Sequence, residues 1–215
     1  MTAPQTELTR RERRKLEVRE RILDASVGLF QQNGIEGTTV VEICDLADVA
    51  HKTFFNHFQS KRELLREIAR SGVENVLVHI EESRKAGASS SARIQHFFEG
   101  VAEHADEAGP MQRELLSEIV HIGHESGDGP EQARKLHDAF ATIVRDGLAT
   151  GDLTKRHSPE TLTEMLMGAY YVLMFNWANL DDYPLHGRAL ETARFLIDSM
   201  VDSEAHSGVR GQGGE

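Results

Sequence analysis

The sequence predicts an all-α protein of about nine helices, with a unit of short helices near the N-terminus and a larger helical bundle after it. Apolar residues recur at intervals near 3.6, and no segment shows the sustained alternation that is typical of a strand. Glycine and proline interrupt the periodic segments at spacings that suit helices. We therefore expect helices over residues 16–33, 40–47, 51–58, 61–85, 92–107, 111–122, 131–150, 159–179 and 187–203.

Composition places the chain among globular proteins. Of its 215 residues, 39% are hydrophobic and 27% are charged, a balance that suits a packed core beneath a charged surface. No run approaches the roughly 18 uncharged apolar residues of a membrane span. The basic N-terminal segment lacks the apolar core of a secretion signal. We expect a cytoplasmic protein with no membrane partner.

The net charge of −11 is unevenly distributed. Residues 1–70 hold 12 Lys and Arg against 11 Asp and Glu, whereas the remainder of the chain holds 12 against 24. An acidic body repels DNA, but a near-neutral first third with a basic leader can approach it. Nucleic-acid binding is therefore expected of the N-terminal part alone.

Residues 39–58 have the spacing of a helix-turn-helix motif. Thr39 is expected to cap the first short helix, because Glu42 follows at the capping-box spacing. About three residues separate that helix from the next, and Asp48 stands where the turn needs a residue that tolerates a positive φ. In such motifs the second helix enters the major groove of DNA while the first lies across the backbone.

The second short helix is expected to have one buried face and one outward face. Phe54 and Phe58 are four residues apart, with Leu64 just beyond, and they predict the buried face. The outward set supplies donors, acceptors and a methyl group for base edges and phosphates. It comprises His51, Lys52, Thr53, Asn56 and His57. Lys61 combines a cation with exposed backbone N–H groups, which suits a phosphate; the alternative for the outward set is a solvated face without a ligand.

This order of motifs resembles the TetR family of regulators. The first helix ends in ASVGLFQQNG, similar to the family's A-x-x-L-F-x-x-x-G ending, and TTVVEIC resembles its threonine-led second helix. The stretch TFFNHFQSKRELL resembles the signature T-[LF]-Y-x-[HY]-F-x-[SN]-K-x-x-L. The resemblance is specific over residues 15–70 and weak beyond them.

The resemblance implies a three-helix DNA-binding domain joined to a bundle for ligand binding and dimerisation. It implies a homodimeric repressor that binds double-stranded operator DNA and is released by a small-molecule effector. Residues 51–57 would read the DNA, and phosphate contacts would come from Thr39, Phe55, His57 and Lys61.

Three residues depart from the family pattern. Phe55 stands where tyrosine is usual, so one hydroxyl–phosphate bond is expected to be missing. Asp48 replaces the usual glycine and places a carboxylate near DNA. Ala50 stands where a serine or threonine cap is common, so the second short helix is expected to begin with a weaker cap.

We divide the chain into a flexible basic arm (1–14), a helix-turn-helix domain (15–65), a helical effector-binding and dimerisation domain (66–205) and a disordered tail (206–215). The basic leader comprises Arg10, Arg11, Arg13, Arg14 and Lys15, followed by Arg19 and Arg21. It is either an arm that contacts the minor groove or phosphates, or a solvated and frayed helix start. Both interpretations stay open.

Residues 165–175 are apolar nearly all round, so their helix must be covered on several sides. One side is expected to face a core or pocket and another a partner subunit, with Gly168 and Ala169 permitting close approach. A pocket for a lipophilic or aromatic effector is expected among apolar side chains of several helices. These are Phe97, Val101, Met111, Leu115, Ile119, Phe140, Met165, Tyr170, Met174 and Trp177. The alternative is that each fills core or interface.

The single cysteine, Cys44, excludes an intrachain disulfide and a cysteine-based zinc site. Its neighbours Glu42 and Asp45 are expected to raise its pKa, which favours a small buried residue over a redox switch.

The histidines suggest a metal hypothesis that we do not favour. His121 and His124 lie one turn apart with Glu118 nearby, and His96 or His104 would have to supply a further ligand. Histidines near a helix C-terminus also stabilise the helix dipole without any ligand. We expect neither a metal nor another cofactor.

Two other functions stay open. A constitutive DNA-binding regulator without a ligand would have the same motif, but the acidic body disfavours non-specific binding as its main role. An all-helical enzyme is disfavoured because the sequence contains no G-x-S-x-G, no H-E-x-x-H and no Gly-rich phosphate loop. We expect a regulator and not an enzyme.

Overall fold

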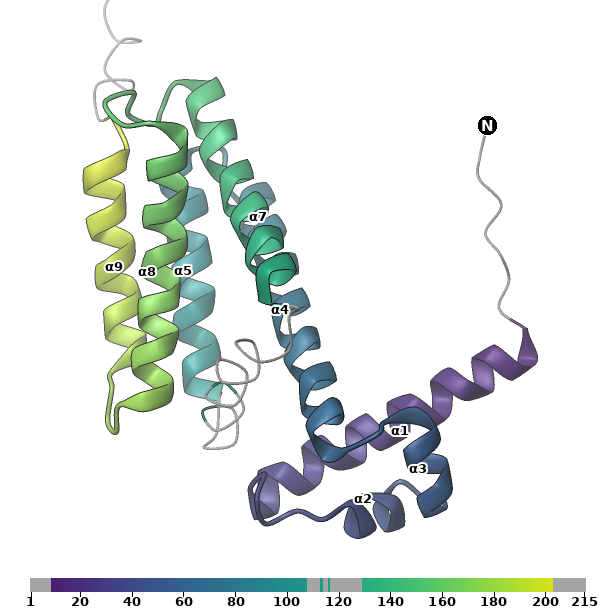
Figure 1. The fold of residues 1–215 in the computed structure, drawn as a ribbon. Helices are drawn as coiled ribbons and strands as arrows, with labels where there is room; N and C mark the ends of the chain where they lie inside the picture. The colour runs from purple at the N-terminus through teal and green to yellow at the C-terminus, as the bar shows by residue number, and fades with distance from the viewer. Residues whose placement is uncertain (1–8, 108–112, 114–115, 117–128, 203–215) are drawn as a thin grey trace, which may run out of the picture. The chain divides into compact units, whose positions relative to one another are not determined.

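The computed structural model describes residues 9–107, 113, 116 and 129–202, and these residues form eight helices (Figure 1). The helices are α1 (Arg10–Asn33), α2 (Val40–Leu46), α3 (His51–His57), α4 (Lys61–Ala86), α5 (Ser90–Glu107), α7 (Gly129–Thr150), α8 (Pro159–Asn179) and α9 (Leu185–Met200). Extended pairing among the described residues is limited to an isolated bridge between Leu153 and Val201. The all-α prediction is confirmed. Most of the helix predicted over 111–122 lies outside the described residues.

The chain divides into two compact units, and the division falls within α4. Of the described residues, one unit contains 9–69 with 113 and 116, and the other contains 70–107 and 129–202. Helix α4 therefore begins in the first unit and ends in the second. The domain boundary that we drew at residue 65 lies slightly earlier in the same helix.

Helix α1 begins earlier than the apolar periodicity predicts. The hydroxyl of Thr9 accepts a hydrogen bond from the backbone N–H of Glu12, and the Glu12 carboxylate accepts one from the Thr9 N–H at 2.8 Å. This capping box starts the helix at Arg10. The prediction of a flexible arm was therefore wrong for residues 10–14, because the periodicity that we used begins only at Leu16.

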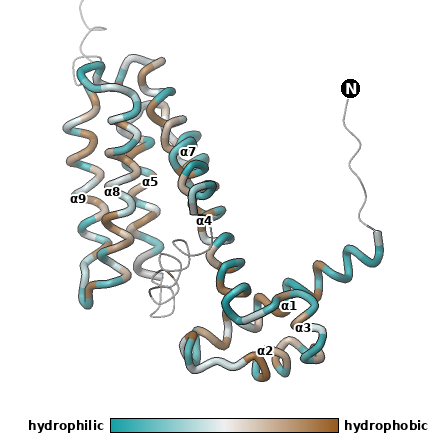
Figure 2. The backbone as a smooth tube through the Cα atoms, in the orientation of Figure 1, coloured by the Kyte–Doolittle hydropathy of each residue, from teal (hydrophilic) through white to brown (hydrophobic). Residues whose placement is uncertain are grey.

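A compact apolar core holds the first unit together. Large side chains from α1, α2, α3 and the start of α4 are completely buried: Ile22, Phe30, Ile43, Phe54, Phe58 and Leu64. Hydrophobic and hydrophilic segments alternate along the helices (Figure 2), as the 3.6-residue pattern predicts.

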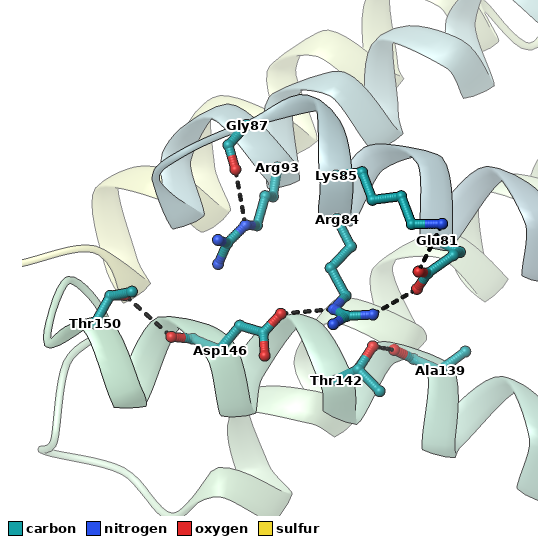
Figure 3. Close-up of polar contacts among 9 residues, drawn as sticks. All are labelled: Glu81, Arg84, Lys85, Gly87, Arg93, Ala139, Thr142, Asp146 and Thr150. Atoms are coloured by element: carbon teal, nitrogen blue, oxygen red, sulfur yellow. Dashed lines mark hydrogen bonds and ion pairs between the residues drawn. The ribbon is translucent and has the colours of Figure 1, made fainter.

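In the second unit, α5 lies along α9 and α7 lies along α8. An ion-pair network joins α4 to α7 in the same unit (Figure 3). Arg84 Nε donates to the Asp146 carboxylate at 2.6 Å, and Arg84 Nη1 donates to Glu81 at 2.7 Å. Lys85 pairs with Glu81 at 3.1 Å. Single exposed ion pairs contribute little to stability, but this network holds the C-terminal end of α4 against α7.

A buried carboxylate joins three parts of the second unit. Asp152 accepts hydrogen bonds from the Ser90 N–H at 2.5 Å, the Ser90 hydroxyl at 2.8 Å and the Thr150 hydroxyl at 2.6 Å. It thereby caps the N-terminus of α5 from a distant part of the chain. Gly147 allows this approach, since a Cβ there would overlap Ser90 Oγ and the Leu153 side chain.

Asp152→Asn is predicted to destabilise the fold by about 2 kcal/mol, because an amide cannot accept all three hydrogen bonds. Burial alone raises the pKa of Asp152, but the Ser90 and Thr150 hydrogen bonds outweigh burial and hold the pKa below its ordinary 3.8. The stabilisation is therefore present above pH 3.8 and is lost as the pH falls through the lower folded-state pKa.

Chemical denaturation of the wild type and the variant at several pH values measures this difference. The difference in free energy of unfolding between the wild type and the variant is expected to shrink as the pH falls. Asp198→Asn, at an exposed carboxylate of α9, controls for loss of charge. A gap that is equal at pH 7 and pH 3 would contradict the assignment.

Candidate nucleic-acid interface

The turn between α2 and α3 has the backbone geometry that the motif requires. Asp48 has a φ of +51°, the left-handed conformation that Asp tolerates better than most residues. The next N–H, that of Val49, donates to the Cys44 carbonyl at 3.0 Å and closes the turn. The prediction that Asp48 provides the positive φ is confirmed.

The capping box predicted at the start of α2 is also present. Thr39 Oγ1 accepts from the Glu42 N–H at 3.3 Å, and the Glu42 carboxylate accepts from the Thr39 N–H at 2.7 Å. These hydrogen bonds lower the pKa of Glu42. Thr39 is exposed at the end of the helix, so a phosphate can approach it, although its hydroxyl already bonds within the box.

Helix α3 has the two faces that its sequence predicts. Phe54 and Phe58 are fully buried, with ring centroids 5.9 Å apart. The residues at the outward positions fall into two groups: His51, Lys52, Phe55 and Asn56 are exposed, whereas Thr53 and His57 are half-buried. The rings of His51 and Phe55 meet edge to face at 4.9 Å. No side chain caps the helix at Ala50, as expected.

Arg19 of α1 fixes the C-terminal end of α3. One Arg19 guanidinium nitrogen donates to the His57 carbonyl at 3.0 Å, and another pairs with Glu67 of α4 at 3.1 Å. The guanidinium carbon also lies 4.3 Å from the centre of the Phe58 ring. The grouping of Arg19 with a basic arm for DNA was therefore wrong, because these internal partners occupy its charge.

Lys61 has a different position from the one we predicted. Its Nζ donates to the backbone carbonyls of Ile35 at 2.6 Å and Thr38 at 3.1 Å. The ammonium thus closes the loop between α1 and α2 instead of standing free for a phosphate. Sequence spacing cannot identify these acceptors, since they lie more than twenty residues away.

An open groove of about 440 Å³ lies between the first turns of α1 and the end of α3, and no acidic residue lines it. Its lining consists of Arg11, Arg14, Lys15, Asn56 and His57. Burial, and then the nearby charges of Lys15 and Arg19, lower the pKa of His57. The His57 Nδ1 is buried and has no hydrogen-bond partner among the described residues. The prediction of a basic leader did not separate Arg11, Arg14 and Lys15 from its other cations, although their i, i+3, i+4 spacing indicates one helix face.

Two minor predictions of the sequence can be placed. Cys44 is buried, and burial followed by the charge of Asp45 raises its pKa, as expected. Within residues 9–107, 113, 116 and 129–202, no three His, Cys, Asp or Glu side chains are placed to hold a metal ion. His121, His124 and Glu118 lie outside the described residues. Among the described helices, none is long and apolar enough to cross a membrane.

Five of the residues predicted to line an effector pocket lie inside the second unit. Phe97, Val101, Phe140, Tyr170 and Trp177 are buried. The Phe97 ring lies 5.2 Å from that of Phe140 and 5.6 Å from that of Tyr170, centre to centre. Burial, with a smaller effect of Tyr171, raises the pKa of Tyr170. These side chains form a closely packed aromatic cluster.

The other pocket candidates differ from this cluster. Met174 is half-buried. Met165 is 53% exposed, so its assignment to a pocket was wrong: on a helix that is apolar all round, composition does not show which side faces inward. Met111, Leu115 and Ile119 lie outside the described residues.

Comparison with known proteins agrees with this geometry. The model of "Bacterial regulatory proteins, tetR family" matches residues 22–68, which contain α2 and α3. The chain is 30% identical over 138 residues to the transcriptional repressor KstR of Mycobacterium tuberculosis. That match covers 63% of this chain and 62% of KstR, so the chain spans less than two thirds of that relative's length.

Solved structures show the same fold. The ketosteroid transcriptional regulator KstR2 of M. tuberculosis has a TM-score of 0.58 at 15% identity, covering 86% of this chain and 95% of that one. FadR of Bacillus subtilis, solved with stearoyl-CoA, has a TM-score of 0.58 at 18% identity, covering 83% and 97%. The helix-turn-helix geometry, the matched segment and the related repressors agree. The segment that contains α2 and α3 is therefore similar to the DNA-binding region of the tetR family of bacterial regulatory proteins.

Proposed function

We propose that this protein is a homodimeric repressor that reads its operator through α3 and leaves it when a lipophilic or aromatic molecule binds the second unit. The observation that carries the proposal is the exposed polar face of α3, held outward by the burial of Phe54 and Phe58. The proposed DNA contacts are Thr39, His51, Lys52, Thr53, Phe55, Asn56 and His57, and Lys61 is no longer among them.

The side chains of α3 offer distinct chemistry to the major groove. Lys52 can donate to the guanine acceptors O6 and N7, and Asn56 can pair with adenine N6 and N7. Phe55 offers an apolar edge to a thymine methyl group, but it lacks the hydroxyl that would reach a phosphate. The set combines base reading with backbone contact, which is the combination that specific binding needs.

Lys52→Ala is expected to weaken operator binding by about 1–3 kcal/mol and to relax the preference at one base position. The side chain is exposed, so the melting temperature should not change. The matched control is Lys155→Ala, at an exposed lysine of the second unit. Fluorescence anisotropy with the operator and single-base variants measures both effects. If the wild type and Lys52→Ala bind the operator with equal affinity, Lys52 does not contact the DNA.

The dimer proposal rests on the outer face of α8. Leu166, Leu173 and Trp177 are buried on one side of this helix, while Met165, Val172 and Phe175 are each more than half exposed on another. An exposed apolar stripe of this kind indicates a binding surface. Phe195 of α9, 69% exposed, has the same apolar character. A second copy of the chain, offering the same stripe, is the occupant that a two-fold symmetric operator calls for.

Gly168→Arg is expected to produce a monomer with at least tenfold weaker operator binding, because each half-site alone provides half of the contacts. A Cβ at Gly168 meets no atom of the protomer within 4 Å, so the fold should persist. Gly72→Arg adds the same charge at an equally open glycine of α4 and serves as the control. Analytical ultracentrifugation gives the oligomeric state. A wild-type monomer at micromolar concentration would refute the proposal.

The effector proposal rests on the aromatic cluster of Phe97, Phe140 and Tyr170. Such side chains favour an apolar, aromatic-tolerant ligand. KstR2 is described as a ketosteroid regulator and FadR was solved with stearoyl-CoA. For this chain we therefore propose a bulky lipophilic effector of one of these two kinds. The rings are in direct contact in this structure, so binding must separate them.

Stearoyl-CoA and a 3-ketosteroid are the probes for this effector. One of them is expected to raise the melting temperature and to weaken operator binding at least tenfold, which requires about 1.4 kcal/mol of coupling. Tyr170→Trp should blunt that response yet preserve operator affinity, whereas Tyr183→Trp, in the loop before α9, should not. A probe that binds free and operator-bound protein equally would exclude ligand control by that class.

A further inference from the structure

We propose that the groove lined by Arg11, Arg14, Lys15, Asn56 and His57 is a phosphate-binding site that holds one phosphate of the DNA backbone beside the reading helix. The inference rests on the proposed placement of α3 on the operator. It assigns a ligand to three cations of α1 that are not among the proposed base contacts and that lie beside Asn56 and His57 of α3, and it gives the N-terminal turns of α1 a defined role.

The cations of the groove are placed by the helix and not by a loose arm. Arg11, Arg14 and Lys15 follow one another at i, i+3 and i+4, which puts them on one face of α1. The Thr9–Glu12 capping box keeps this face helical. Arg10 and Arg13 belong to the same turns but do not line the groove. The helix therefore fixes the backbone positions of these exposed cations before a ligand binds, which lowers the entropy cost of binding.

The electrostatics of the groove favour an anion. Among the described residues, no carboxylate lies within ion-pair distance of Arg11, Arg14 or Lys15. Burial lowers the pKa of His57 most, and the charges of Lys15 and Arg19 lower it further. The second contribution is the effect of nearby positive charge. The three cations Arg11, Arg14 and Lys15 match the acceptor oxygens of a phosphate.

The position and shape of the groove favour a phosphodiester over a free anion. Asn56 and His57 are residues of α3 itself, so a ligand in the groove touches the helix that reads the bases. The groove is open, and an open site admits one phosphate of a continuous backbone. Backbone contacts of this kind set the register of a reading helix without reading the sequence.

A charge-matched pair of variants tests the assignment. R11A/R14A removes two groove cations, and R10A/R13A removes two cations from the same turns outside the groove. R11A/R14A is expected to weaken binding to operator and to random duplex by a similar factor, about tenfold, and to lower the salt slope by about 0.9 per protomer. R10A/R13A should change either affinity less than about threefold, because Arg10 and Arg13 lie outside the groove and salt screens their charges. Equal losses of DNA affinity in the two variants would overturn the assignment of a phosphate site to the groove.

Single methylphosphonate substitutions then locate the phosphate. In the wild type, neutralising the phosphate in the groove should cost affinity. In R11A/R14A, where Lys15 is the groove cation that remains, the same substitution should cost clearly less, while substitutions elsewhere keep their cost. Inorganic phosphate, compared with chloride at equal ionic strength, tests the other source of the anion. Two results together would identify a site for a free anion and overturn the proposal. Inorganic phosphate would specifically inhibit DNA binding by the wild type, and no methylphosphonate position would change its cost in R11A/R14A.

The proposed placement of α3 on DNA and the proposed phosphate site in the groove can be tested separately. A wild-type protein that binds no DNA overturns the placement of α3 and the groove together. If the wild type binds its operator but R11A/R14A and R10A/R13A have the same affinity, only the assignment of the phosphate site to the groove is overturned. Circular dichroism melting of each variant confirms that the comparison is between folded proteins.

Discussion

The burial of Phe54 and Phe58 on one side of α3 is the constraint on which the rest of the DNA-binding unit depends. A helix of seven residues without a side-chain cap is not stable alone, so its position comes from packing. Burying each phenylalanine contributes about 1.5–3 kcal/mol, and because the two are four residues apart they fix the rotation of the helix. His51, Lys52, Phe55 and Asn56 are then left exposed, and the Arg19 contact with the His57 carbonyl holds the end of the helix.

The cations of the first unit have two different uses. Arg19 and Lys61 bond to carbonyl groups and a carboxylate inside the unit and hold its helices together. Arg11, Arg14 and Lys15 line a groove without a carboxylate. In a chain with a net charge of −11, long-range attraction to DNA is weak, so the proposed contact with the DNA backbone depends on these local cations.

Local sequence patterns predicted the fold and the faces of α3 well, and non-local contacts account for the rest. The Thr39–Glu42 box, the positive φ of Asp48 and the buried pair Phe54 and Phe58 all follow from spacing within a few residues. The carbonyl partners of Lys61 and the capping of α5 by Asp152 join residues far apart in sequence, and no periodicity reveals them. The early start of α1 was visible in the Thr9–Glu12 spacing. The outward position of Met165 was not, since residues 165–175 of α8 are apolar on nearly every face.

Selection of binding sites from random duplex DNA tests the central claim most directly. A dimer that reads through two copies of α3 should enrich a two-fold symmetric motif whose half-sites are about one helical turn apart, and Lys52→Ala should lose the preference at symmetric positions in both halves. Failure of the wild-type protein to enrich any motif would contradict the account, and an enriched motif without symmetry would contradict the dimer on which the operator geometry depends.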